Sequence, residues 1–348
     1  MCVKGCAHES LYPSNVSAPL TAQAPSGPLR AVEHIRRMRG GSQSHLMRCS
    51  DGNYYVVKFQ NNPQHLRILV NELLGTKLAA RLGLSTTAVA IIDVAEDLIR
   101  LTPDLQIETP WTVNWHPIPC QPGRQFGSRY PGSPHHLTVL DFLPEKQLLH
   151  SGNLQDFVGM LVFDLWTCNA DPRQVIFGRQ EVGAPYQAWM IDQGFCFNGG
   201  EWKFPDKPRR NLYDRKVVYQ HVRGIESFEP WLIRLESEKM ARILLAIART
   251  IPPEWYEFDS ASFLRLLGQL DSRRSKVREL LWSARKSHPD FFPNWAEENE
   301  TEGDGNCTRN GGRKFHCGTH SRPKGSKSEH GTKPAPDTRP VVIKYGRL

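Results

Sequence analysis

The sequence predicts an α+β protein in two lobes, and the order of its hydrophobic patterns is the main reason. Short strand-like segments and a single amphipathic helix fill the first part of the chain, whereas helical patterns dominate the second part. The chain has 348 residues, of which 39% are hydrophobic, and this is sufficient for one large domain with a buried core. We therefore expect a small strand-rich lobe followed by a mainly helical lobe.

The strand-rich lobe is predicted over residues 29–143. Turn residues at 50–53 separate two short apolar segments, which is typical of a β-hairpin. Leucine and valine then recur at three- and four-residue spacing, as in an amphipathic helix. Segment 102–134 is rich in Pro, Gly and aromatic residues without a clear period, so we expect a long structured loop there. The elements expected before this loop are strands at 31–38, 45–49 and 54–59, a helix at 65–82 and a strand at 84–94.

The helical lobe is predicted over residues 144–298. A strand at 136–142 leads into it, and a second strand at 188–197, which we expect to break at Asp192, interrupts its helices. Helical periodicity is strongest at 153–168, 230–250 and 260–287.

The two ends of the chain are predicted to be disordered, because residues 1–28 and 299–348 lack periodic hydrophobicity. Residues 301–348 contain ten Lys and Arg against four Asp and Glu, so this tail carries +6 of the net charge of +8. Weak nonspecific contact of the tail with nucleic acid is one interpretation, and a solvated tail is the other. The rest of the chain has no charge bias toward polyanions.

The cysteines and the hydropathy indicate a cytoplasmic protein. The eight cysteines are widely spaced in a long chain, which disfavours a small disulfide-linked secreted fold. The first 30 residues contain no apolar core typical of a signal peptide. No window approaches the roughly 18 to 20 apolar residues that a membrane-spanning helix needs, so we expect no membrane insertion.

Two features of the first lobe are suited to binding a nucleotide. A glycine-rich turn at Gly41, Ser42 and Gln43 would bring backbone amides close to phosphate oxygens. Lys58 ends a predicted strand and Glu72 lies on the predicted helix, so the lysine could neutralise phosphates while the glutamate positions it. An ordinary turn and two unrelated surface charges remain the alternative interpretation.

Two features of the second lobe are suited to phosphoryl transfer. Asp171 lies in a polar break after the 153–168 helix, where a carboxylate could take the proton of an acceptor hydroxyl. Asp192 directly follows an apolar strand, and a carboxylate there could bind Mg²⁺ that bridges phosphates. The segments around Asp171 and Asp192 are each also typical of an ordinary turn. The interpretation as a phosphoryl-transfer site therefore depends on the order of all four features along the chain.

Together these features resemble the HipA-like kinases of the protein-kinase-like superfamily. The most specific stretches are Phe-Asp-Leu-Trp-Thr-Cys-Asn-Ala-Asp at 163–171 and Ile-Asp-Gln-Gly-Phe-Cys-Phe at 191–197. The resemblance implies a two-lobed kinase fold, ATP and Mg²⁺ as cofactors, and a protein Ser or Thr hydroxyl as acceptor. By the same resemblance, the catalytic residues would be Asp171, Asn169 and Arg173, and Asp192 with Gln174 would hold the metal. The nucleotide would be bound by Gly41, Ser42, Gln43, Lys58 and Glu72 and by a hinge of Leu140, Asp141 and Phe142.

One position departs from the family pattern. The family usually reads Asp-Arg-His-x-x-Asn, and Ile176 occupies the place of the metal-binding Asn. Isoleucine cannot bind a metal ion, although Gln174 could replace the missing amide. A nucleotide-binding pseudokinase or partner-binding module, and a kinase of lipids or small molecules, therefore remain alternatives.

One further segment could lie near the nucleotide by analogy with the family. Phe126, Gly127 and Ser128 lie in the 102–134 segment, and the serine would be a candidate phosphorylation site. We favour a flexible surface turn at these residues.

Overall fold

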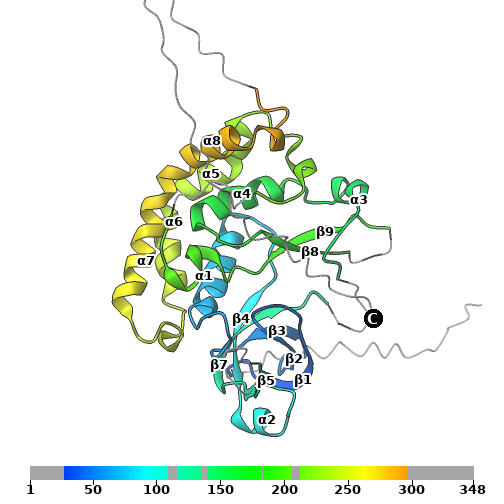
Figure 1. Cartoon of the computed structure of the whole chain (residues 1–348), viewed down its shortest axis with the longest axis vertical. Helices are drawn as coiled ribbons and strands as arrows, with labels where there is room; N and C mark the ends of the chain where they lie inside the picture. Colours follow the sequence, from blue (N-terminus) through cyan, green and yellow to red (C-terminus); the bar gives the residue numbers. More distant parts are fainter. Residues whose placement is uncertain are drawn as a thin grey trace, which may run out of the picture. The chain divides into compact units, whose positions relative to one another are not determined.

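The computed structural model describes residues 27–108, 116–132, 134, 139–179, 181, 183–205 and 212–296. The chain forms two compact units: unit 1 consists of Met1–Leu69 and Thr87–Leu137, and unit 2 of Val70–Thr86 and Thr138–Leu348. The described strands lie mainly in unit 1 and the long helices in unit 2, which confirms the predicted α+β class (Figure 1). The predicted tail beyond residue 298 and most of segment 1–28 lie outside the described residues.

Unit 1 is built on a five-stranded antiparallel sheet with the order β1-β2-β3-β7-β4. Alternate residues of β3 point into the core, so that Tyr55 and Val57 are buried together with Phe59, which follows the strand. A short helix α2 (Glu96–Arg100) and a two-stranded ribbon of β5 (Gln106–Ile107) and β6 (Ile118–Pro119) add Ile99 and Ile107 to this core. The sheet consists of β1 (Ala31–Arg37), β2 (His45–Cys49), β3 (Tyr54–Lys58), β7 (Gly123–Arg129) and β4 (Val89–Val94).

Strand β7 corrects the prediction of a long loop at 102–134. It lies between β3 and β4 in the sheet, so both of its edges are hydrogen-bonded. A Cβ atom at Gly127 would lie 2.1 Å from Cδ1 of Ile92, so the glycine makes room for a core side chain of the neighbouring strand. Ser128 Oγ lies 2.7 Å from Thr87 Oγ1, and the preferred interpretation of a flexible surface turn at 126–128 was therefore wrong. The sequence did not predict this strand, because Phe126 is its one large apolar residue.

Unit 2 is organised around helix α4 (Asp156–Thr167), which is buried along its length from residue 157 onward. Helices α5 (Glu229–Glu236), α7 (Ser260–Arg273) and α8 (Val277–Ser287) pack against it. The indole Nε1 of Trp166 donates a hydrogen bond to the carbonyl of Leu270 at 2.8 Å, which satisfies the buried indole. A Cβ atom at Gly159 would lie 2.3 Å from the Trp231 ring, so this glycine allows α5 to approach α4 closely.

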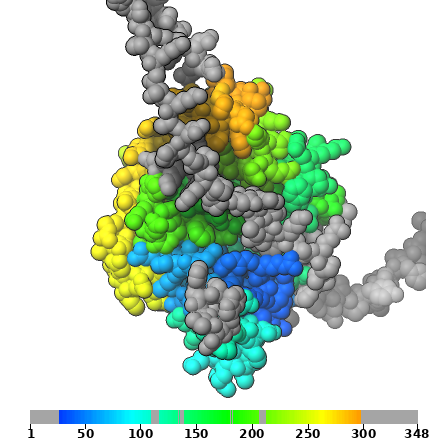
Figure 2. Space-filling model, in the orientation of Figure 1, coloured from blue at the N-terminus to red at the C-terminus, as the bar shows by residue number. Residues whose placement is uncertain are grey.

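One predicted helix of unit 2 differs from the observed structure. The expected helix at 230–250 is two helices, α5 and α6 (Lys239–Ala248), because Ser237 adopts an extended backbone with ψ of 137° between them. Helices α6 and α7 form part of the unit's surface in Figure 2. Leu245 of α6 and Leu264 of α7 are exposed, whereas other apolar residues of these helices are buried. Helix α1 (Ile68–Arg81) and the short α3 (Glu145–Leu149) complete the set of α-helices in the described ranges. None of the described helices has the length and apolar character that crossing a lipid bilayer requires.

Candidate active site

A β-hairpin of unit 2 brings the two predicted loops together. Strand β8 (Gln174–Gly178) pairs antiparallel with β9 (Gln187–Ile191), and Gln174 lies opposite Ile191. The loop that ends at Arg173 and the loop that starts at Asp192 therefore leave the same end of this hairpin. The backbone N–H of Ala170 also donates to the carbonyl of Phe195 at 2.9 Å, which links the two loops directly.

The second loop begins at Asp192, which directly follows the strand as the sequence indicated. Strand β9 ends at Ile191, because Asp192 adopts a left-handed backbone with φ of 58°. This conformation turns the chain out of the strand direction, and non-glycine residues rarely adopt it. The acidic side chain is thereby placed at the end of the hairpin.

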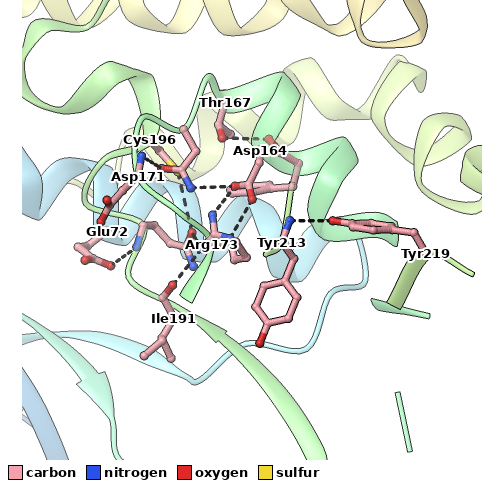
Figure 3. A network of polar contacts seen from close by, with 12 residues as sticks. Glu72, Asp164, Thr167, Asp171, Arg173, Ile191, Cys196, Tyr213 and Tyr219 are labelled. Carbon is pink, nitrogen blue, oxygen red and sulfur yellow. Dashed lines mark hydrogen bonds and ion pairs between the residues drawn. The ribbon is translucent and has the colours of Figure 1, made fainter. Parts of the chain in front are cut away.

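Asp164 on α4 supports the loop that carries Asp171. Its Oδ1 accepts a hydrogen bond from Asn169 Nδ2 at 3.1 Å, and the Oδ1 of Asn169 accepts one from the backbone N–H of Asp171 at 3.2 Å. Asp164 also forms a buried ion pair with Arg173 (Figure 3). Burial raises the pKa of Asp164, and the neighbouring guanidinium and amide oppose that rise. Burial alone would lower the pKa of Arg173, but the Asp164 carboxylate reverses this effect and raises it.

Helix α1 supports the loop that carries Asp192. The Oε2 of Glu72 accepts a hydrogen bond from the backbone N–H of Gln193 at 2.9 Å (Figure 3). The adjacent Asn71 donates through Nδ2 to the carbonyls of Gly194 and Cys196 at 2.7 and 3.0 Å. The predicted residue Glu72 is therefore a buried neighbour of the loop that begins at Asp192.

The site side chains of unit 2 form two layers that differ in burial. The outer layer is half-buried and consists of Asp171, Gln174 and Asp192. The inner layer is buried and consists of Glu72, Asp164, Asn169, Arg173 and Gln193. Only the outer layer is exposed enough to contact a substrate or a metal ion, and the inner layer fixes the loops that carry it.

Gln174 and Asp192 fit a magnesium site by their chemistry and position. Gln174 Nε2 lies 3.1 Å from Asp192 Oδ2, so the amide group is beside the carboxylate. Amide and carboxylate oxygens are the donors that Mg²⁺ prefers, and an approaching cation would favour the amide oxygen over its nitrogen. Ile176 is two residues further along β8, opposite Trp189, and is thus displaced from Asp192 along the hairpin. Within the described ranges, no three His, Cys, Asp or Glu side chains cluster as a metal site.

The predicted phosphate-binding turn of unit 1 joins β1 to β2. The N–H of Gln43 donates to the carbonyl of Gly40 at 3.1 Å, and Gln43 has a φ of 48°. The side chain of Gln43 is held by Arg37 Nη2 at 2.7 Å and by the backbone of Glu108. Both the side chain and the backbone N–H of Gln43 therefore have partners within unit 1.

The other predicted nucleotide-binding residues occupy three different environments. Lys58 is the last residue of β3 and is buried, as is Ser42, whereas Gly41 is exposed. Leu140 exchanges two backbone hydrogen bonds with Phe177, at 2.9 and 2.7 Å, so its polar backbone groups are occupied by β8.

The hinge residues that follow Leu140 differ in exposure. Asp141 and Phe142 are exposed. Phe142 has the guanidinium of Arg215 4.7 Å from its ring centroid. The strand expected at 136–142 is reduced to the bridge at Leu140 in the residues that the structure describes.

Sequence reasoning missed two of the buried supports of the site, Asp164 and Gln193. Asp164 carried one usable signal, because it is a lone charge within the apolar run of α4. Strand β8 and the inward position of Gln193 carried none, because both depend on partners distant in sequence.

The comparison with protein families agrees with the kinase resemblance over part of the chain. Residues 31–180 match the family of HipA-like kinases, a range that contains Asp171 and Gln174 and ends before Asp192. No curated protein matches the chain. A solved structure of the Golgi casein kinase with Mn/ADP bound is 13% identical, has a TM-score of 0.43 and covers 74% of each chain. The Helicobacter pylori proinflammatory kinase CtkA is 13% identical with a TM-score of 0.46, covering 72% of this chain and 94% of its own. HipA of Shewanella oneidensis, in a complex with HipB and operator DNA, is 12% identical with a TM-score of 0.38, covering 77% of this chain and 76% of its own.

Proposed function

Since residues 31–180 match the HipA-like kinase family, we propose that this protein is an ATP-dependent kinase that phosphorylates protein Ser or Thr hydroxyls. The observation that carries the proposal is the hairpin geometry of unit 2, which joins the Asp171 loop to the Asp192 loop. Both carboxylates are half-buried and rest on a buried polar network. Such an arrangement suits two negative groups that must stay in fixed positions during phosphoryl transfer.

In the proposed reaction, Asp171 acts as the general base. The acceptor oxygen bonds to the γ-phosphorus, the bond from that phosphorus to the β,γ-bridging oxygen breaks, and ADP leaves. The Asp171 carboxylate takes the proton of the acceptor hydroxyl, and the hydrogen bond that the backbone N–H of Asp171 donates to Asn169 Oδ1 fixes the loop during this transfer. Mg²⁺ would supply neutralisation of the phosphate charge.

The remaining residues would bind and position the nucleotide. Asp192 and Gln174 would hold the metal, since they offer adjacent oxygen-bearing side chains at the end of the hairpin. Lys58 would neutralise the α- and β-phosphates and Glu72 would position its ammonium group, as the order of the motifs suggests. The turn at residues 41–43 would offer backbone N–H groups to the phosphates.

The experiment is transfer of labelled γ-phosphate from ATP to the protein itself or to a protein mixture, with Mg²⁺. We expect Asp171→Asn and Asp192→Asn to reduce transfer by about 10²- to 10⁴-fold. Asp97→Asn is the matched control, because it makes the same change at an exposed position of α2 that pairs only with nearby Arg100 in the described contacts. Transfer that is unchanged in the two site variants would refute the assignment.

A catalytically silent nucleotide-binding module is the second candidate, favoured by Ile176 in place of the expected Asn. It predicts that Mg-ATP raises the melting temperature of the wild type while no acceptor becomes labelled. A lipid or small-molecule kinase would instead show ATP consumption with such hydroxyl compounds and none with proteins.

A further inference from the structure

Arg173 makes all of its described contacts within the protein. Its side chain is 1% exposed, and its Nε and Nη2 donate to the two carboxylate oxygens of Asp164 on α4. Its Nη1 donates to the carbonyl of Ile191 and to Oε1 of Gln193, each at 2.9 Å. The guanidinium is therefore occupied on both edges, and it has no open face toward a substrate.

The two acceptors of Nη1 are the residues on either side of Asp192. Asp192 has a left-handed backbone, which is sterically unfavourable for a non-glycine residue. Such a conformation persists only where the surroundings hold it. Arg173 donates hydrogen bonds to the residues before and after Asp192, and Glu72 accepts a hydrogen bond from the backbone N–H of Gln193.

We propose that Arg173 is a positioning residue, which sets the direction of the Asp192 carboxylate by holding Ile191 and Gln193 against the Asp164 carboxylate. This inference deepens the proposed function, on which it rests, and it replaces the expectation that Arg173 takes part in catalysis directly. A planar guanidinium can serve two acceptors on each edge at once, and a lysine ammonium cannot reproduce that geometry.

The same network joins the two carboxylates of the proposed reaction. Asp164 accepts from Asn169, whose Oδ1 accepts from the N–H of Asp171, and it accepts from Arg173, which holds the residues flanking Asp192. The positions of Asp171 and Asp192 thus both depend on the side chain of Asp164 in the buried helix α4. A buried ion pair by itself is weak evidence that a fold is stabilised. We therefore assign the pair of Asp164 and Arg173 a role in holding the two loops in position.

The test uses the full chain with Arg173→Lys, which keeps a positive charge beside Asp164 and removes the two-edged contact. Arg273→Lys is the matched control: Arg273 is also a buried arginine of unit 2, and its Nε donates to the carbonyl of Leu165 rather than to the Asp192 loop. Two measurements are made on each protein. One is ADP binding by calorimetry over a series of MgCl₂ concentrations, and the other is hydrogen exchange at the Gln193 amide.

We expect Arg173→Lys to raise the Mg²⁺ concentration for half-maximal ADP affinity by about 10- to 100-fold, as for other residues that orient a metal ligand. ADP affinity without Mg²⁺ should stay within about twofold, because Arg173 is not expected to touch the nucleotide. Protection of the Gln193 amide should fall by about tenfold or more, while Arg273→Lys changes neither quantity beyond about twofold. An unchanged Mg²⁺ response together with unchanged Gln193 protection in folded Arg173→Lys would overturn the proposal.

A second variant keeps the proposal testable if Arg173→Lys does not fold. Gln193→Met retains the Arg173–Asp164 pair and the bond to Ile191 but removes one acceptor of Nη1. This variant should also raise the Mg²⁺ concentration for half-maximal ADP affinity, by a smaller factor than Arg173→Lys does. No rise in this variant would overturn the proposal. If the wild type shows no Mg-dependent ADP binding, the proposed function fails, and hydrogen exchange at residue 193 still decides whether Arg173 holds the loop.

Discussion

Acidification should destabilise unit 1 through the buried residue His45. This residue begins β2 directly after the glycine-rich turn and is 0% exposed. Its Nδ1 lies 3.1 Å from Nε2 of His34, and its Nε2 lies 3.7 Å from Sγ of Cys120. Burial, together with the neighbouring charges of His34 and Arg37, lowers the pKa of His45 from 6.5 to about 4, although the nearby Asp104 opposes the shift.

The direction and size of the effect follow from this pKa. Below pH 6.5 the unfolded chain binds a proton at His45, whereas the folded chain does not until about pH 4. The contribution of neutral His45 to the free energy of unfolding is therefore fully present above pH 6.5 and is lost as the pH falls toward 4. The difference amounts to about 3 kcal/mol at most, and most of it is lost by pH 4.5. His34 adds to the loss, because burial also lowers its pKa.

The assay is urea unfolding at pH 7.5 and pH 4.5, with hydrogen exchange of β2 peptides to locate the change in unit 1. His45→Gln keeps a polar side chain that does not titrate, so its free energy of unfolding should fall by about 2 to 3 kcal/mol less between these pH values than that of the wild type. His150→Gln, which alters an exposed histidine of unit 2, is the control and should leave the wild-type pH dependence unchanged. Parallel losses of stability in wild type and His45→Gln would refute the reasoning.

Two further predictions concern the proposed metal-binding end of the hairpin and the packing of α4. Gln174→Ala should raise the Mg²⁺ concentration at which ADP half-maximally stabilises the protein by about tenfold, whereas Ile176→Asn should leave it within about twofold, because the amide beside Asp192 is that of Gln174. Melting curves over a MgCl₂ series measure both, and a gain of Mg²⁺ affinity in Ile176→Asn would contradict the assignment of Gln174. Gly159→Ala should lower the free energy of unfolding by about 1 to 3 kcal/mol, since the added Cβ would lie 2.3 Å from the Trp231 ring. Urea unfolding measures this change, and stability equal to that of the wild type would show that α5 can move away without cost.

The elements with strong periodicity were the ones that sequence reasoning could locate. The hairpin of β2 and β3, the amphipathic α1 and the apolar α4 all have patterns that repeat within a few residues. Strand β7 lacks such a pattern because two neighbouring strands supply its hydrogen bonds and a glycine makes room for Ile92. Its place in the sheet therefore depends on residues far away in the chain.

The candidate site divides in the same way. Asp171 and Asp192 could be proposed from the sequence, because Asp171 lies in the polar break after an apolar helix, Asp192 directly follows an apolar strand, and the order of the motifs indicated a kinase. Their support by Asp164, Arg173 and Glu72 could not be proposed, because those contacts join residues that are up to 121 positions apart. The sequence alone determined the fold class and the chemical types of the reacting groups, since local periodicity and residue chemistry are written along the chain. Only the tertiary structure decided that Arg173 faces inward and Gln174 faces Asp192, because the direction of a side chain depends on the packing and strand register around it.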